Sequence, residues 1–454
     1  MAIETLNPAT GERLATFPEM GQPELDRILT AAVAAQKAWA RLPFADRAAP
    51  MRRVAALLRE RAQDFARLMA LEMGKPLKDG AAEVTKCGWV CDYYAETAER
   101  HLAPREEASD AGRSYVRFDP LGVVLAVMPW NFPYWQVFRF IAPHIMAGNG
   151  GLLKHASNVP QCALSIEKVM HDAGFPRDLF RTLLVGAKPV AGIIRDPRVA
   201  AATITGSEPA GRAVAEAAGQ ALKPSVLELG GSDPFIVLAD ADIEQAAKVA
   251  AQARTINAGQ SCICAKRFIV EAPVYQAFLD KLRTAMQAIR VGDPFDAATD
   301  IGPQARRELR DELHDQVTRA VAQGARPVLG CAVPPGPGAF YPVSILADVL
   351  PDNVAAQEEL FGPVAVVIRA RSANDAVAIA NDSRFGLGAS LWTRNPAEID
   401  RLVPLIEAGA VFVNGLVKSD PRLPFGGVKT SGYGRELGLE GIRAFVNVKT
   451  VWIK

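Results

Sequence analysis

This chain of 454 residues has few cysteines, almost no excess of one sign of charge and no long apolar runs. Six cysteines are too few for a disulfide framework, and no Cys-x-x-Cys pair meets a second one, so we expect no structural zinc site. The 51 basic and 50 acidic residues leave a net charge of +1, without a Lys/Arg block suited to nucleic acid or a membrane surface. No stretch approaches the roughly 18 consecutive apolar residues of a membrane span.

The N-terminal segment M-A-I-E-T-L-N-P also lacks a basic region followed by an apolar one, so we expect a cytoplasmic protein with reduced thiols. The five histidines are scattered, and we expect no bound metal. Four cysteines are interpreted as small core residues, namely Cys87, Cys91, Cys162 and Cys331.

Alternating helical and strand patterns occupy most of the chain, which is long enough for two or three domains. The N-terminal region is expected to open with helices from Gln22 onward, the second ending near Gly74 and Pro76. Predicted strands lie at 123–127, 151–154, 181–186, 235–238, 267–270, 365–368 and 411–414, with helices at 163–171, 243–256 and 274–290. This pattern predicts two doubly wound α/β domains with a cleft between them and ligands at the C-terminal ends of parallel strands.

Two thiols stand one residue apart in N-A-G-Q-S-C-I-C-A-K-R, residues 257–267. A metal site, a disulfide and a nucleophile all use such residues. The absence of further ligands nearby disfavours the metal, and the spacing alone does not choose between the other two.

Three further segments carry side chains or turns suited to chemistry. A-T-I-T-G-S-E-P-A-G-R, residues 202–212, puts Gly206 and Ser207 between a strand and a helix, where free N–H groups suit a pyrophosphate or are simply solvated. Glu228 lies in an apolar strand, either ion-paired or held for proton transfer with a raised pKa. Asn131 in P-W-N-F-P precedes a helix from about Pro133, and it either caps that helix or donates to an oxyanion.

Six motifs in order resemble those of aldehyde dehydrogenases. They are P-W-N-F-P at 129–133, T-G-S at 205–207, L-E-L-G-G at 227–231, G-Q-S-C at 259–262, E-E-L-F-G-P-V at 358–364 and P-F-G-G-V-K-T-S-G-Y-G-R-E at 424–436. The resemblance implies an NAD(P)-dependent enzyme with a cofactor domain at 1–228, interrupted near 105–122 by an oligomerisation hairpin, and a catalytic domain at 229–425. It also implies a C-terminal oligomerisation strand at 435–454 and a homodimer or homotetramer.

The same resemblance implies a role for each catalytic side chain. Cys262 matches the nucleophile, and the amide of Asn131 with the backbone N–H of Cys262 would stabilise the thiohemiacetal oxyanion. Glu228 matches the base that activates water for thioester hydrolysis. Because members that transfer the acyl group to coenzyme A usually lack this Glu, the free acid is the expected product.

The cofactor contacts implied by the resemblance involve eight positions: Trp130, Lys154, Ser157, Gly206, Ser207, Leu229, Glu359 and Phe361. Family members often read Lys-Pro-x-Glu where this chain has K-H-A-S, so Ser157 replaces a carboxylate that holds a ribose 2′-hydroxyl. Lys154 and Ser157 could then donate to a 2′-phosphate, which favours NADP, with NAD as the alternative if Ser157 is only a helix cap.

The substrate side is similar to succinate-semialdehyde dehydrogenases. Arg139, on one helix face with Trp135, and Ser419 would receive the carboxylate of a small semialdehyde, whereas an ion pair is the other interpretation of Arg139. The second arginine of those enzymes is replaced by Ile256, with Arg254 two residues earlier. Glutarate semialdehyde, a wider range of aldehydes with NAD, a thiol esterase and a non-catalytic protein are the alternatives.

Cys264 lies outside this catalytic set. Its spacing suggests a reversible disulfide with Cys262 that protects the nucleophile from over-oxidation, and a small buried filler is the alternative.

Overall fold

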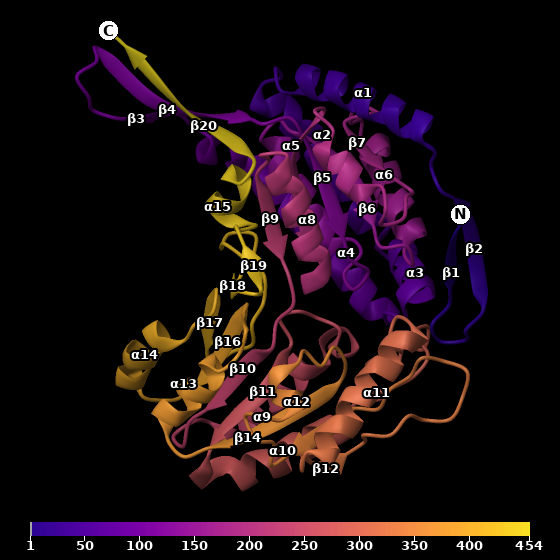
Figure 1. Cartoon of the computed structure of the whole chain (residues 1–454), viewed down its shortest axis with the longest axis vertical. Helices are drawn as coiled ribbons and strands as arrows, with labels where there is room; N and C mark the ends of the chain where they lie inside the picture. Colours follow the sequence, from indigo (N-terminus) through magenta and orange to yellow (C-terminus); the bar gives the residue numbers. More distant parts are fainter. Residues whose placement is uncertain (1) are drawn as a thin grey trace.

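Two mainly parallel sheets, one above the other in Figure 1, organise the chain, and a thin arm projects from the upper one. The structure is a computed structural model and describes residues 2–454. It confirms the predicted α/β architecture with two sheet-based lobes.

The upper sheet, as described, has six strands in the order β19-β9-β8-β5-β6-β7, all parallel except β19. Its strands are β5 Val123–Met128, β6 Gly150–His155, β7 Phe180–Thr182, β8 Val199–Thr205, β9 Ser225–Glu228 and β19 Gly432–Tyr433. Its helices are α1 Gln22–Trp39, α2 Phe44–Glu60, α3 Ala62–Met73, α4 Leu77–His101, α5 Trp135–Met146, α6 Pro160–Asp172, α7 Val190–Arg195 and α8 Glu208–Gln220.

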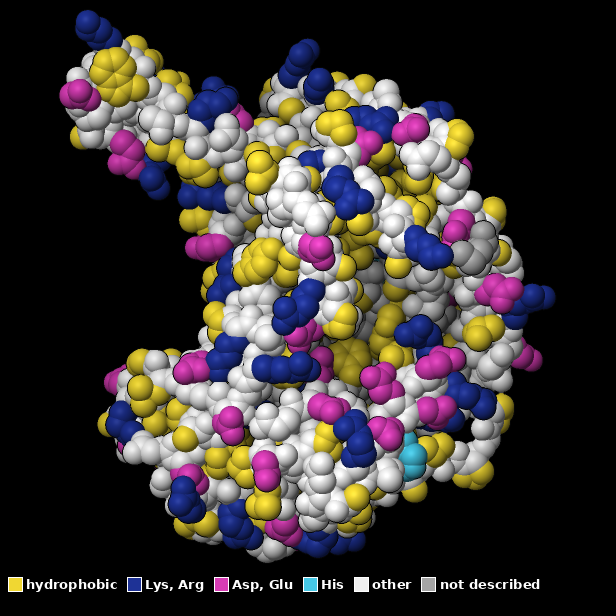
Figure 2. Space-filling view, in the orientation of Figure 1, with side chains coloured by type: hydrophobic (Ala, Val, Ile, Leu, Met, Phe, Trp, Pro, Cys, Tyr) yellow, Lys and Arg dark blue, Asp and Glu magenta, His cyan; other side chains and the backbone are white. Residues whose placement is uncertain are grey.

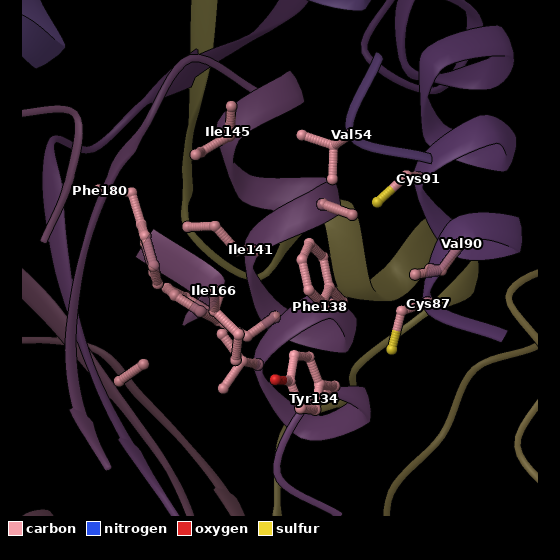
Figure 3. Close-up of a cluster of buried hydrophobic side chains, with 14 of the residues drawn as sticks. Val54, Cys87, Val90, Cys91, Tyr134, Phe138, Ile141, Ile145, Ile166 and Phe180 are labelled. Carbon is pink, nitrogen blue, oxygen red and sulfur yellow. The ribbon is translucent and has the colours of Figure 1, made fainter. Parts of the chain in front are cut away.

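The side chains of β5 point alternately to the two faces of the sheet, and a different set of helices covers each face. Val123 and Leu125 face a cluster with α1, α7 and α8, while Val124 and Ala126 face the larger cluster of α2 to α6. Figure 3 shows the second cluster, with α5 side chains packed between those of α2 and α4 and those of α6 and β7. Because all 12 residues of α5 are buried, this helix is a rigid support for the site at its N-terminus.

The lower sheet has, within the described residues, seven strands in the order β12-β13-β14-β11-β10-β16-β17, all parallel except β12. They are β10 Asp233–Val237, β11 Ala265–Glu271, β12 Arg326–Leu329, β13 Ser344–Ala347, β14 Val364–Ala370, β16 Gly388–Trp392 and β17 Ala410–Val413. Helices α9 Ile243–Thr255 and α10 Tyr275–Gln287 pack in one cluster, and α11 Arg307–Ala322, α12 Val354–Gln357, α13 Ala373–Asn381 and α14 Pro396–Leu402 in another.

The remaining elements connect the lobes and form the arm. Strand β15 Phe385–Gly386 pairs with β18 Val428–Lys429, and β19 and α15 Gly438–Arg443 then return to the upper lobe. Strand β20 Val446–Ile453 ends the chain by pairing with β4 Arg113–Pro120, which also pairs with β3 Arg105–Glu106. This three-stranded ribbon is the arm in Figure 1.

Three expectations about secondary structure were wrong. The N-terminal region opens with a hairpin of β1 Ala2–Leu6 and β2 Arg13–Pro18, before the first helix. The strand expected at 181–186 ends at Thr182, and the C-terminal segment 435–454 contains helix α15 before its strand. Cys331 is only half-buried, in a loop, with a φ of 66°, unlike Cys87, Cys91 and Cys162, which are fully buried in the core.

Candidate functional site

Two cavities meet at Cys262. One of about 730 Å³ is lined by Trp135, Arg139 and Ser419, and one of about 810 Å³ by Trp130 and Asn131. Cys262 and Gln136 line both of them. A thiol at this junction can therefore reach a group in either cavity.

The two sheets face this junction with opposite ends of their strands. In the upper sheet the strand order reverses between β5 and β8, and the loops after these two strands carry Asn131 and Ser207 at C-terminal strand ends, as expected. The lower sheet differs, because Cys262 lies before β11 and Glu359 before β14. The expectation that ligands meet C-terminal strand ends was thus wrong for the lower lobe, which faces the site with the N-terminal ends of its strands.

The segment before Cys262 is held in an unusual backbone conformation. Asn257, Ala258 and Gly259 all have positive φ, a region that is costly for residues other than glycine. Gly259 has no room for a side chain, since a Cβ would lie 2.2 Å from the carbonyl carbon of Gly362. Lys266 secures the other end by donating to the carbonyl oxygens of Ser261 (3.0 Å) and Cys262 (2.9 Å).

Cys262 is a protonated thiol in this setting. Burial raises its pKa to about 12, although Arg139 and Lys266 favour the thiolate. Its backbone N–H donates to no acceptor among residues 2–454. The thiol needs a base before it can attack, and the N–H is free for a developing oxyanion.

Asn131 presents its amide nitrogen toward the same loop. Its Oδ1 accepts a hydrogen bond from Gln136 Nε2 (3.0 Å), so its Nδ2 points to the carbonyl oxygen of Gln260 (3.0 Å). One of the two Nδ2 hydrogens remains for another acceptor. No side chain caps α5, so the capping interpretation of Asn131 was wrong.

Two contacts that the sequence did not suggest fix the position of Asn131. Lys75 Nζ (2.9 Å) and Asn257 Nδ2 (2.7 Å) donate to its carbonyl oxygen. Lys75 also forms a buried ion pair with Glu83, whose Oε1 accepts from the backbone N–H groups of Tyr134 (2.9 Å) and Trp135 (3.0 Å).

Glu228 is a buried carboxyl group without a hydrogen-bond partner. It is 2% exposed, and neither oxygen is bonded within the described residues. Burial raises its pKa well above the ordinary value, buried Glu436 adds repulsion, and Arg139 opposes both. Of the two interpretations, the ion pair is wrong, and the carboxyl group is suited to proton transfer.

Arg139 is paired, but with a carboxylate that the sequence did not indicate. Its guanidinium forms a buried ion pair with Glu436, donates to Thr205 Oγ1 (3.1 Å) and lies 4.6 Å from the ring centroid of Phe425. The side chain lines the cavity of about 730 Å³, yet its charge is already balanced by Glu436.

The larger cavity suits a dinucleotide. Six residues expected to contact the cofactor line it: Trp130, Gly206, Ser207, Leu229, Glu359 and Phe361. The N-terminus of α8 opens into it, and no side chain caps that helix, so backbone N–H groups are free for a pyrophosphate. Glu359 is oriented by Lys266 (3.2 Å) and by the N–H of Gly231 (3.0 Å).

Lys154 and Ser157 lie apart from this lining, at and beyond the C-terminal end of β6. Burial lowers the pKa of Lys154, which has no ion pair among residues 2–454. Ser157 is exposed, and α6 begins at Pro160 without a side-chain cap, so the interpretation of Ser157 as a helix cap was wrong.

Cys264 and Arg254 both point into the protein interior. Cys264 is fully buried, its Sγ donates to the carbonyl oxygen of Ile256 (3.5 Å), and both it and Cys262 are free thiols. The guanidinium of Arg254 donates to four backbone carbonyl groups, so it braces the loop and does not line the cavity of about 730 Å³.

No cluster of three or more His, Cys, Asp or Glu within residues 2–454 could hold a metal ion. None of the helices in this range combines the length and apolarity needed to cross a bilayer.

Comparisons with known proteins agree along the whole chain. The family model "Aldehyde dehydrogenase family" matches residues 1–451. A probable succinate-semialdehyde dehydrogenase [NADP(+)] of Synechocystis sp. is 52% identical over 453 residues, covering 100% of both chains. The succinate-semialdehyde dehydrogenase [NADP(+)] of Mycolicibacterium paratuberculosis is 53% identical, covering 100% of this chain and 97% of the relative.

A solved structure agrees as well. The succinic semialdehyde dehydrogenase of Streptococcus pyogenes, solved in complex with NADP+, superposes with a TM-score of 0.97 at 38% identity, covering 100% of both chains. These matches extend over both cavities and the arm. From its end-to-end match to the family model and its half-identical relatives, the chain belongs to the aldehyde dehydrogenase family.

Proposed function

We propose that this enzyme oxidises succinate semialdehyde to succinate with NADP, through a thioester on Cys262 that water hydrolyses. The observation that carries the proposal is the position of Cys262 in the walls of both cavities. An aldehyde in one cavity and a hydride acceptor in the other would meet at this thiol. The names of the half-identical relatives support the substrate and the cofactor.

In the first half-reaction, the Cys262 thiol gives its proton to solvent, and the resulting thiolate attacks the aldehyde carbon and forms a thiohemiacetal. Its oxyanion would accept from the free N–H of Cys262 and the free hydrogen of Asn131 Nδ2. Bound NADP supplies the hydride acceptor. Gln136, which holds the Asn131 oxygen, keeps the donor side of the amide turned to the loop.

In the second half-reaction, Glu228 removes a proton from the water that attacks the thioester. A buried carboxyl group with raised pKa and two free oxygens is a strong base for this task once it has lost its proton. Gly426 leaves room for it, because a Cβ there would lie 2.6 Å from Glu228 Oε1.

For the cofactor, we propose that Lys154 and Ser157 bind the 2′-phosphate. Both are free of competing carboxylate partners among residues 2–454, and position 157 carries no negative charge to repel a phosphate. Ser157→Glu should lower the preference for NADP over NAD, as the ratio of kcat/KM values, by roughly 10- to 100-fold. An unchanged ratio would contradict this assignment.

For the substrate, we propose that its carboxylate lies in the cavity of about 730 Å³, near Trp135, Arg139 and Ser419. The test compares succinate semialdehyde, glutarate semialdehyde and butanal, each with NAD and NADP. Succinate semialdehyde with NADP should give the highest kcat/KM. Equal kcat/KM values for butanal and succinate semialdehyde would refute the proposed substrate.

A further inference from the structure

Within residues 2–454, one cation in the wall of the cavity of about 730 Å³ is neither exposed to solvent nor paired with a carboxylate, whereas Lys248 and Lys418 also line the cavity but are exposed. Among the buried cations of its wall, Lys75 is paired with Glu83 and Arg139 with Glu436. Lys86, on α4, lines the same cavity and forms no ion pair with any carboxylate of residues 2–454. Its charge is therefore available to a ligand.

Two neighbours hold the Lys86 ammonium in place. It donates to Ser419 Oγ (2.7 Å) and lies 4.1 Å from the ring centroid of Trp135. An ammonium has three N–H groups, and the bond to Ser419 is the one hydrogen bond that Lys86 Nζ donates among the described residues. Because Ser419 accepts from Lys86, its own O–H remains free to donate. Two adjacent donors thus face one cavity.

The charge balance of this wall also favours an anion. Burial and, to a smaller extent, the charge of Arg139 lower the pKa of Lys86 to about 8. The groups that act in the opposite direction are Cys87, Glu83 and Asp420. Asp420 is already bonded to Arg422 (2.6 Å), and Glu83 to Lys75. A bound carboxylate would supply the missing negative charge.

We propose that Lys86, together with Ser419, binds the carboxylate at the far end of the semialdehyde. This inference rests on the proposed function and deepens it, since it names the specificity-determining cation. The role of Arg139 is then to pair with Glu436 and to lower the pKa of Glu228, next to the reacting carbon. Trp135 holds the ammonium of Lys86 in place.

The decisive variant is Lys86→Met, which keeps most of the length of the side chain and removes its charge. Its kcat/KM for succinate semialdehyde should fall roughly 10- to 100-fold, mainly through KM, while kcat/KM for butanal changes by less than about 2-fold. Lys86→Arg should retain most of the preference. Lys78→Met is the matched control, because Lys78 lies on the same helix, exposed and outside the cavity. This variant should leave kcat/KM for both substrates unchanged.

A second measurement is independent of the proposed substrate. Succinate, used as a probe anion, should inhibit butanal oxidation competitively in the wild type and roughly 10- to 100-fold more weakly in Lys86→Met. Equal inhibition of both proteins, or an equal loss by Lys86→Met on butanal and succinate semialdehyde, would overturn the role of Lys86. If the wild type does not prefer succinate semialdehyde but succinate inhibition still requires Lys86, the anion site stands and the proposed substrate fails.

Discussion

Glu228 is the clearest case in which burial sets the chemistry of one residue. The carboxyl group is buried without a hydrogen-bond partner among residues 2–454, and Glu436 adds repulsion, so its native pKa lies well above the ordinary 4.5. As the proposed base, Glu228 is active only after losing its proton, so kcat should rise with pH through this raised pKa.

Glu228→Gln separates the two half-reactions. Steady-state turnover should fall roughly 10²- to 10⁴-fold, because the general base is lost, while a single burst of reduced cofactor persists. Rapid-mixing absorbance measurements would show this. Loss of the burst together with turnover would contradict a role limited to deacylation.

The same substitution should stabilise the protein in a pH-dependent way. The unfolded carboxyl group ionises above its ordinary pKa of 4.5, whereas the native one retains its proton, so the wild type loses stability as pH rises through this window. Glutamine does not ionise. The gain in free energy of unfolding should therefore be larger at about pH 8 than at about pH 5 in urea titrations. A gain that is equal at both pH values would contradict the raised pKa.

Cys264 is predicted to protect Cys262 from irreversible oxidation. Peroxide would convert Cys262 to a sulfenic acid, and the Cys264 thiol would displace water from it to form a disulfide that dithiothreitol reduces. In Cys264→Ala, the activity recovered with dithiothreitol after peroxide treatment should be several-fold lower than in wild type. Equal recovery would assign Cys264 to packing alone.

At the scale of elements, the N-terminus of α5 is joined to α4 by a buried ion pair. Lys75 and Glu83 bond to each other and to the loop that carries Asn131. The pair therefore couples the position of α4 to that of Asn131, the proposed oxyanion donor.

Lys75→Met should destabilise the protein by about 3–5 kcal/mol, because Glu83 is left buried without its cation. It should also lower kcat, since the Asn131 carbonyl loses one of its two donors. Urea unfolding and steady-state kinetics measure the two effects. Lys78→Met, an exposed lysine on α4, should change the free energy of unfolding by less than about 1 kcal/mol. Similar values for the two variants would exclude a special role for this pair.

At the scale of the whole molecule, two lobes and an arm serve different purposes. The chain crosses to the lower sheet after β9 and returns with β19, and we propose domain limits at residues 1–228 and 229–425 from these crossings. Figure 2 shows basic and acidic side chains interspersed over this face of both lobes, with hydrophobic side chains near the tip of the arm.

The arm is predicted to mediate a homodimer or homotetramer. Strand β20 pairs with β4 on one side and is an edge strand on the other, and Val448 (61%) and Ile453 (46%) are exposed on it. The double variant Val448→Asp/Ile453→Asp should therefore dissociate the assembly while β20 stays paired with β4. Light scattering would report the mass. A monomeric wild type, or a variant with unchanged mass, would contradict this prediction.

The sequence alone determined the family and predicted the catalytic set. Cys262, Glu228 and Asn131 lie in short motifs whose chemistry is readable within a few residues, and the alternation of apolar runs predicted both α/β lobes. The family assignment is confirmed by the match of the family model to residues 1–451, and the NADP prediction agrees with the names of the relatives.

Only the tertiary structure decided how charges are shared and which strand ends face the site. Arg139 is balanced by Glu436 and Lys86 stands beside Ser419, although each pair is far apart in sequence. Local propensity and motifs act over a few residues, whereas ion pairing and burial depend on which distant segments the fold brings together. The sequence K-C-G-W around Lys86 resembles that of any amphipathic helix, and its free charge becomes visible only when every neighbouring carboxylate has been assigned to another partner.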